Sequence, residues 1–482
     1  MTVTLRPRHP ILAATLSFLF PGLGQAYAGR MWRAVLLAAP VVFLALAIGV
    51  VALWFGVMFR NRLFSSSFLI GLLVLDGVLL GWRAFAITDA GLGGWQRPTR
   101  LTGTAIVGLL LATIAMHAYV ALVVVRLDTT LGTVFGGRPP TTAGGVSGAT
   151  QPPPLNVPEY AWDGTDRLNF LLIGIDAAAG REDALTDTIL VVSVDPVAKN
   201  AVMVSIPRDT GFLPLPDTSI YGDGLYPRKI NQLSTDAAAD PAAWCPDLDP
   251  AEAEACGIRT LQRSVGLYLG IEINYFAMVD LGGFTDLIDA VGGVRICPAG
   301  RLSDPEYLDP RSGVRGITIS SGCHTLDGRQ ALAYSRIRSG VMVLGDGTVE
   351  PQDDFKRSER QQEVLLALRA ELAAADFIFE LPALLEAIGS TVTTDFPRDQ
   401  AGDLASLLPL IAGPEIERLV LGLPEFVDPP LDPARNYLLL PRRDAIRDAA
   451  EELFGAEEPL QGWYVGSDAS RPPDAVSPSP SP

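Results

Sequence analysis

Long apolar stretches fill the first 126 residues of the chain and are absent from most of the rest. Three of them, Ala34–Met58, Phe68–Ile87 and Gly103–Val125, reach the roughly 20 apolar residues that a membrane-spanning helix needs. An earlier stretch, Pro10–Gly29, is interrupted by the sequence PGLGQAYAG, which favours a broken or re-entrant helix. The pattern predicts a helical membrane domain over residues 1–126 with about three spans.

Two segments of biased composition flank the remaining sequence. Residues 127–165 are rich in Thr, Gly and Pro, which is typical of a flexible to semi-extended linker. Residues 457–482 end in SPSPSP and are expected to be a disordered tail. Between them, residues 166–456 alternate apolar runs with polar turns, which indicates a folded domain.

That domain opens with three apolar runs rich in β-branched residues. They predict strands at Leu168–Ile175, Thr188–Val194 and Ala201–Ile206. If the strands form an antiparallel meander, Asp176, Asp187 and Arg208 all fall at one end of the sheet. Two carboxylates and a guanidinium there suit a cation bound to a phosphate. The alternative is that the aspartates are ordinary turn or cap residues and that Arg208 pairs with Asp209 at the surface.

Helical and extended segments alternate through the rest of the domain. Helices are predicted at Thr260–Leu269, Gly283–Val291, Arg329–Tyr334, Gln361–Ala375, Ala383–Ile388 and Arg443–Phe454. Further strands are predicted at Tyr275–Leu281, Gly293–Ile296 and Tyr334–Ile337. The mixture indicates an α/β domain in which helices cover a central sheet.

Charge divides the chain as sharply as hydropathy does. Residues 1–150 carry 11 arginines and 3 acids, a formal charge of +8. The net charge of the whole chain is −17, so the remaining residues carry −25. An acidic folded domain argues against nucleic-acid binding, which depends on basic surface. With three spans and a cytoplasmic N-terminus, seven of the 11 arginines lie inside and the large domain lies outside. Four full spans would place that domain inside.

All four cysteines, Cys245, Cys256, Cys297 and Cys323, belong to the acidic domain, and none forms a CxxC pair. Outside the membrane, two disulfides are the better interpretation. We favour Cys245–Cys256 and Cys297–Cys323, although the sequence leaves three pairings open and four buried free thiols remain the alternative.

An acid lies inside the second predicted span. Asp76 is a functional candidate because a carboxylate in a bilayer is costly. The structural alternative is that it pairs with a group on a neighbouring helix.

Two arginine motifs are further candidates for anion binding. In YSRIR, Arg336 and Arg338 share one face of the predicted strand, and two like charges side by side repel unless an anion lies between them. Lys229, in the sequence KIN, could join them. The alternative is a charged sheet edge that prevents aggregation.

The second motif is DFKRSERQQ. On a helix, Asp354, Arg357 and Gln361 share one face and Arg360 falls away from it, so Arg357 is the better ligand of the two arginines. The alternative is a solvated first helical turn with local ion pairs.

Seven sequences in a fixed order carry a resemblance to a known family: LLIGID, TDTILVVSVDP, SIPRDT, KIN, DLGGFTDLIDAVGGV, LDGRQALAYSRIR and DFKRSERQQ. With them the domain resembles the LytR–CpsA–Psr family from about residue 168 to 454. The resemblance implies a three-layer α/β/α domain with a mixed sheet, anchored in the plasma membrane and exposed outside it. It implies a phosphotransferase that moves a glycopolymer from a polyprenyl-pyrophosphate carrier onto peptidoglycan.

The resemblance also implies the site. Mg²⁺, with Mn²⁺ as an alternative, would be held by Asp176 and Asp187. The pyrophosphate would be bound by Arg208, Arg336, Arg338 and Arg357. Residues beside it would be Lys229, Asp354, Gln361, Arg181, Asp209 and Arg360. Family members commonly carry an arginine two residues before the second aspartate; this chain has Leu185 there, and Arg181 is the candidate to replace it.

In the implied reaction, a sugar hydroxyl attacks the phosphorus attached to the polymer, and Asp209 and Asp354 are both open as the proton acceptor. Two rival functions remain. Water could replace the sugar, which would make the protein a pyrophosphatase, or the domain could be a non-catalytic regulator that binds the lipid carrier.

Overall fold

The computed structural model describes residues 9–54, 62, 64–93, 99–135, 162, 165–175, 185–217, 219–249, 252–310, 312–374, 387–389, 391–401, 403, 416–429 and 437–455. Two predicted site residues, Asp176 and Arg181, lie outside these ranges, as do the expected tail and most of the expected linker. The chain divides into unit 1 (Met1–Leu131 with Pro397–Ala405) and unit 2 (Gly132–Phe396 with Ser406–Pro482), which are described separately.

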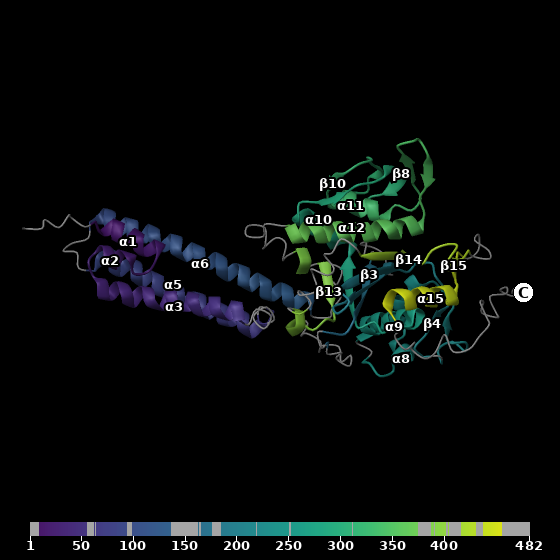
Figure 1. Cartoon of the computed structure of the whole chain (residues 1–482), viewed down its shortest axis with the longest axis horizontal. Coiled ribbons are helices and arrows are strands. Elements are labelled where there is room, and N and C mark those ends of the chain that lie inside the picture. Colours follow the sequence, from purple (N-terminus) through teal and green to yellow (C-terminus); the bar gives the residue numbers. More distant parts are fainter. Residues whose placement is uncertain are drawn as a thin grey trace, which may run out of the picture. The chain divides into compact units, whose positions relative to one another are not determined.

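Unit 1 contains the three predicted spans, and all are helical. They are α3 (Met31–Trp54), α5 (Ser66–Leu92) and α6 (Arg100–Val134), drawn in purple to blue in Figure 1. Each contains a stretch long and apolar enough to cross a membrane. α6 continues through residues 127–134, where we expected the linker to begin. Its 35 residues give a helix of about 52 Å at the usual rise per residue, well over the roughly 30 Å of a bilayer core.

The broken helix expected at the N-terminus is confirmed. α1 (Pro10–Leu19) and α2 (Leu23–Tyr27) are separated by a turn in which Gly22 has φ +100°, and a Cβ on Gly24 would lie 2.0 Å from the Ala13 carbonyl oxygen. Gln25 is fully buried and donates to the Ala86 carbonyl of α5 at 2.9 Å. The PGLGQAYAG sequence therefore packs two short helices onto α5.

Asp76 pairs with a group on a neighbouring helix, which is the structural alternative to a functional role. Its Oδ1 lies 2.7 Å from Nδ1 of His117 on α6. One further short helix of unit 1, η2, spans Arg398–Gln400.

Unit 2 is built on a six-stranded mixed sheet. The strand order is β13 (Val392–Thr394), β6 (Tyr275–Asp280), β1 (Leu168–Ile175), β2 (Thr186–Asp195), β3 (Asn200–Ser205) and β14 (Glu417–Val420). β1, β2 and β3 form the predicted antiparallel meander, with Leu171 opposite Val191 and Val191 opposite Val204. β6 and β14 run parallel to their neighbours β1 and β3.

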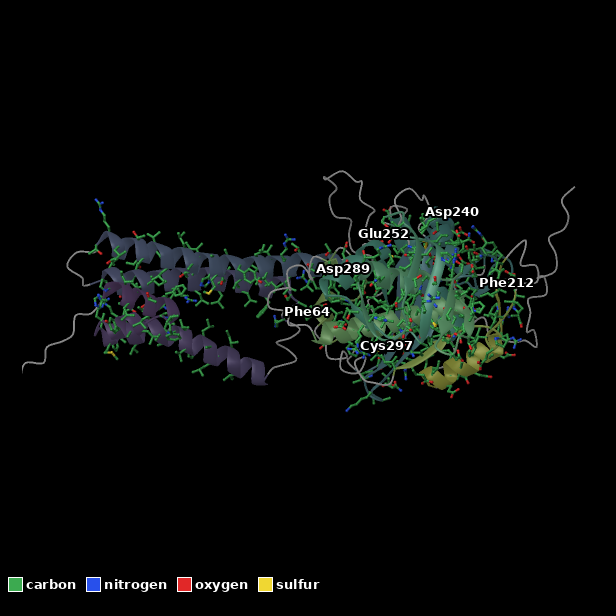
Figure 2. All side chains as sticks on the ribbon, turned by 90° about the horizontal axis from the view of Figure 1, so that it is seen from above. Phe64, Phe212, Asp240, Glu252, Asp289 and Cys297 are labelled. Atoms are coloured by element: carbon green, nitrogen blue, oxygen red, sulfur yellow. A yellow bond between two sulfur atoms is a disulfide. The ribbon has the colours of Figure 1, made fainter. Side chains whose placement is uncertain are left out.

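Helices cover both faces of this sheet, which confirms the three-layer α/β/α fold (Figure 1). One layer is α7 (Ile230–Ala239), α8 (Pro241–Trp244), α9 (Ala253–Leu269) and α15 (Arg443–Phe454). The other is α10 (Leu281–Ala290), α11 (Gly328–Arg336) and α12 (Asp354–Ala374). Side chains of α7, α9 and α15 share one buried core with β1, β2 and β3, while α10, α11 and α12 form a second core. Asp240, labelled in Figure 2, caps α8 by accepting the N–H of Ala243.

Smaller sheets complete the unit. A four-stranded sheet has the order β12 (Val349–Pro351), β11 (Val341–Leu344), β8 (Gly300–Leu308) and β9 (Arg315–Ile319). Two-stranded sheets pair β7 (Val294–Ile296) with β10 (His324–Leu326), β4 (Leu213–Pro214) with β5 (Leu225–Tyr226), and β15 (Val427–Asp428) with β16 (Leu440–Pro441).

Both favoured disulfides are present. Cys245 is bonded to Cys256, and Cys297, labelled in Figure 2, is bonded to Cys323. Each bond joins segments of unit 2 that are close in sequence.

One predicted strand is wrong. Residues 334–336 are the last part of helix α11, and Arg338 lies beyond its end. The helix begins with a capping box, in which Asp327 accepts the backbone N–H of Gln330 and the Gln330 side chain accepts that of Asp327. This cap fixes a helical first turn, and the alanines and leucine that follow favour helix. Arg336 and Arg338 therefore do not alternate along a strand. Of the predicted helix Ala383–Ile388, only the last two residues are described, and they are helical.

Candidate functional site

A cavity of about 580 Å³ opens at the predicted end of the meander. Four parts of the chain line it: the start of β2, the turn after β3, the first turn of α7 with the segment that leads into it, and the end of α11 together with α12. The lining residues are Leu185, Asp187, Arg208, Asp209, Pro227, Arg228, Lys229, Asn231, Gln232, Arg336, Arg338 and Arg357. Seven of these were predicted site residues. Asp354, Arg360 and Gln361 were also predicted but do not line the cavity.

Asp187 and Arg208 meet as the meander requires. Arg208 Nη1 donates to Asp187 Oδ1 at 2.5 Å, and its Nε lies 3.5 Å from Asp354 Oδ1. Burial works to lower the pKa of Arg208, but Asp187 and Asp354 raise it more, so its net shift is upward. The guanidinium is therefore firmly charged. Arg208 therefore pairs with Asp187 and Asp354, and not with Asp209 at the surface as in the alternative interpretation of the sequence.

Asp209 instead contacts Lys229. The Lys229 Nζ donates to Asp209 Oδ1 at 2.6 Å, which joins the residue before α7 to the turn after β3. The backbone fixes the same approach, since the N–H of Ile230 donates to the Thr210 carbonyl at 2.8 Å. Phe212, labelled in Figure 2, has φ +54°, so the chain is in the left-handed region two residues after Thr210. Such strained backbone is often found at functional sites.

Arg357 is a buried guanidinium at the cavity wall, with 4% of the residue exposed. Its Nη2 donates to the Asp187 carbonyl at 2.9 Å and lies 3.1 Å from Asp354 Oδ1. Among the described residues its Nε has no hydrogen-bond partner. Burial lowers the pKa of Arg357 and raises that of Asp354. Asp354 thus lies behind the cavity and orients two of its arginines.

Arg360 has a different role from the one the resemblance implied, which is a correction. Its Nε donates to the Tyr334 carbonyl at 2.7 Å, and its other nitrogens donate to the Ile337 carbonyl and to Gln352. These contacts tie α12 to the end of α11 and leave the guanidinium away from the cavity. Gln361 is similarly committed, because it donates to the Ser335 carbonyl at 3.3 Å.

Arg228, Asn231 and Gln232 line the cavity and were not predicted. Arg228 pairs with Asp236, which also accepts the Tyr226 hydroxyl at 2.5 Å. Asn231 is 5% exposed, and its Oδ1 has no hydrogen-bond partner in the part of the chain that the structure describes. Asn231 is the last residue of the KIN motif, and Arg228 and Gln232 adjoin that motif on either side, so the motif was the signal available in the sequence.

A second cavity, of about 320 Å³, lies between the sheet and the helices α7 and α9. Most of its wall is apolar, and includes Ile173, Ile175, Ile258 and Met278. Thr186 also lines it and is the immediate neighbour of Asp187 in the first cavity. An apolar cavity therefore lies next to a strongly cationic one.

Comparison with known proteins gives the following similarities. The sequence model of the LytR_cpsA_psr family matches residues 148–423. The polyisoprenyl-teichoic acid–peptidoglycan teichoic acid transferase TagU of Oceanobacillus iheyensis is 30% identical over 248 residues, which are 52% of this chain and 64% of that protein. The regulatory protein MsrR of Staphylococcus aureus is 28% identical over 233 residues, 48% of this chain and 57% of that protein. The chain thus spans less than two thirds of each relative. The crystal structure of Bacillus subtilis TagV has a TM-score of 0.44 and 24% identity, and the match covers 61% of this chain and 99% of that one.

Proposed function

Because the chain belongs to the LytR_cpsA_psr family, we propose that it is a transferase that moves a glycopolymer from a polyprenyl-pyrophosphate carrier onto peptidoglycan. The observation that carries the proposal is the charge of the larger cavity. Six cationic side chains line it: Arg208, Arg228, Lys229, Arg336, Arg338 and Arg357. Two acids, Asp187 and Asp209, line it as well. Such an excess of positive charge suits a ligand with several negative charges, and arginine matches phosphate oxygens in pairs.

The reaction follows from the ligand. The oxygen of a peptidoglycan sugar hydroxyl forms a bond to the phosphorus that carries the polymer, and the bond from that phosphorus to the bridging oxygen breaks. The hydroxyl proton passes to a base, and polyprenyl phosphate leaves. The arginines stabilise the charge on the transferred and leaving phosphates, which is the main contribution a protein makes to phosphoryl transfer. Of the two acids considered as the base, Asp209 lines the cavity, whereas Asp354 lies behind it and pairs with Arg208 and Arg357.

The smaller cavity supports a lipid-linked substrate. Its apolar wall, between the sheet and α7 and α9, is suited to prenyl units. It adjoins the cationic cavity at Thr186 and Asp187. A polyprenyl pyrophosphate could therefore place its tail against Ile173, Ile258 and Met278 while its phosphates contact the arginines.

A divalent cation fits the oxygen groups at the cationic cavity. Mg²⁺ binds one or two carboxylates and completes its shell with water and substrate phosphates. Asp187 supplies a carboxylate, and Asn231 an amide oxygen that has no hydrogen-bond partner among the described residues. Asp176, the other expected ligand, lies outside the described residues. We propose that these residues hold Mg²⁺, or Mn²⁺, which when bound would neutralise phosphate charge.

We propose further that the protein is a multi-pass membrane protein with unit 2 outside the plasma membrane. The three apolar helices, the arginine bias of the short loops and the two disulfides support this placement. A reporter fused after Arg138 tests it, and cytoplasmic reporter activity would contradict it.

The function is tested with the full-length protein in lipid nanodiscs, supplied with a polyprenyl-pyrophosphate-linked glycopolymer and peptidoglycan. We expect polymer to become covalently joined to peptidoglycan, and Arg336→Ala or Arg338→Ala to reduce the rate at least a hundredfold. Arg442→Ala is the matched control, since Arg442 is a half-exposed arginine paired with Asp428. Wild-type rates in both cavity variants would refute the site.

The products separate the rival functions. Free polymer phosphate with no joined product would indicate a pyrophosphatase. Binding of the lipid pyrophosphate without any turnover would indicate a regulator, the function that the name of the relative MsrR describes.

A further inference from the structure

An exposed aromatic side chain lies beside the cationic cavity. Tyr437 is 42% exposed and is the one aromatic among the exposed large apolar side chains in the described part of unit 2. The Nζ of Lys229 lies 5.8 Å from the centre of its ring, and Lys229 lines the cavity. The ring is therefore at the edge of the site, and neither the arginine motifs nor the proposed reaction assigns it a role.

The backbone that carries this ring is fixed to the cavity wall. The N–H of Leu439 donates to the Asp209 carbonyl at 2.9 Å, and the N–H of Gly211 donates to the Leu439 carbonyl at 3.0 Å. Leu438 is buried so closely against Gly211 that a Cβ there would lie 2.6 Å from it. An exposed ring on an anchored segment is a pre-organised binding surface, because little conformational freedom is lost when a ligand packs on it.

The electrostatic environment places the phenol near the acids of the site. Burial raises the pKa of Tyr437, and the negative charges of Asp209, Asp354 and Asp353 raise it further. The hydroxyl therefore stays protonated and can donate a hydrogen bond. A tyrosine combines a rigid apolar face with a polar end, and a pyranose ring offers the complementary combination of a C–H face and hydroxyl groups.

We propose that Tyr437 is the platform on which a sugar ring packs at the reaction centre. The inference rests on the proposed function, because a glycopolymer transferase must hold a sugar within bonding distance of the phosphorus. Two sugars meet this condition: the donor sugar attached to the pyrophosphate, and the acceptor sugar of peptidoglycan. Both present the same C–H face, and the experiment distinguishes them.

The test compares Tyr437→Leu with Tyr437→Phe in the full-length protein in nanodiscs, with Val197→Ala as a control at an exposed apolar position. Phenylalanine keeps the ring, whereas leucine is apolar but lacks it. We expect Tyr437→Leu to lower transfer about tenfold and Tyr437→Phe less than threefold, a difference typical of an aromatic contact. Affinity for sugar-free polyprenyl pyrophosphate should be equal in all variants.

The kinetic constants identify the sugar. A raised KM for peptidoglycan with unchanged donor hydrolysis assigns the ring to the acceptor. A raised KM for the lipid-linked polymer, with unchanged affinity for the sugar-free lipid, assigns it to the donor. Transfer by Tyr437→Leu within twofold of wild type would overturn the proposal.

Direct binding separates this inference from the proposed function. If the wild-type protein fails to bind polyprenyl pyrophosphate, the proposed function is refuted. The role of Tyr437 in sugar binding is then tested by the affinity of the protein for soluble peptidoglycan fragments and for free glycopolymer. Weaker glycan binding by Tyr437→Leu than by Tyr437→Phe supports the platform, and equal binding overturns it.

Discussion

Arg360 should stabilise the site without touching the ligand, and Arg360→Met tests this because methionine keeps much of the apolar stem and removes every donor. The residue is 4% exposed. Its guanidinium donates to the carbonyls of Tyr334 and Ile337 and to the Gln352 side chain. The first two acceptors lie at the end of α11, where the charge of an arginine also favours the helix dipole.

The magnitude follows from these contacts and from the cost of burial. Three hydrogen bonds from a charged donor contribute roughly 5–9 kcal/mol, at about 1.5–3 kcal/mol each. Burial lowers the pKa of Arg360 from 12.5 to about 10, which corresponds to about 3 kcal/mol that the substitution relieves. We therefore expect Arg360→Met to lower the free energy of opening of α11 by about 2–6 kcal/mol.

Native-state hydrogen exchange measured by mass spectrometry on peptides that cover residues 328–338 reports this opening free energy in the full-length protein. Lys356→Met is the matched control: Lys356 lies one turn earlier on α12 in an exposed pair with Glu359, and such pairs contribute less than about 1 kcal/mol. A change in Arg360→Met no larger than in the control would refute the reasoning. Loss of pyrophosphate binding with unchanged exchange would restore Arg360 as a direct ligand.

Two further predictions concern acids of unit 2. Burial raises the pKa of Asp395 to about 7, although its carboxylate accepts the N–H of Phe276 at 2.7 Å. Because the folded pKa lies above the unfolded one, the stability linked to this group is present below about pH 4 and is lost as the pH rises through 7. Asp395→Asn should therefore melt at a higher temperature than wild type at pH 8 but not at pH 4, whereas the exposed control Asp346→Asn should show no such gain. Melting temperatures of Asp395→Asn and wild type that change with pH in parallel would contradict this. Asp187→Asn should weaken Mg²⁺ binding at least tenfold in calorimetric titration, and equal affinity would remove Asp187 from the metal site.

The sequence predicted the site best where a topological rule brought distant residues together. Successive strands of an antiparallel meander run in opposite directions, so the start of one strand and the end of the next lie at the same end of the sheet. This rule placed Asp187 beside Arg208, and the 2.5 Å contact confirms it. The structure shows the periodicity of two in β1, because one alternating set, which includes Leu171 and Ile173, belongs to the core shared with α7 and α9.

Prediction failed at the end of a helix. The sequence predicted a helix over Arg329–Tyr334 and a strand over Tyr334–Ile337, but α11 continues to Arg336. A run as short as YSRI fits a strand or a helix and is ambiguous by pattern alone. Arg228 and Asn231 were missed for another reason. Their position depends on tertiary contacts, such as the bond from the Thr186 hydroxyl to the Asn231 carbonyl, that no local pattern encodes.

Although the strand was wrong, Arg336 and Arg338 both line the cationic cavity, and the argument that selected them was electrostatic. Arg336 and Arg338 were selected because like charges so close in sequence need an anion between them, an argument that holds for a helix end as well as for a strand. Arg357 also favours an anion in the cavity, because its Nε is buried without a hydrogen-bond partner among the described residues. An unpaired buried donor costs about 1–3 kcal/mol, which an anion in the cavity would recover. Conformation thus decides how these arginines reach the cavity, whereas their charge determines what the cavity can bind.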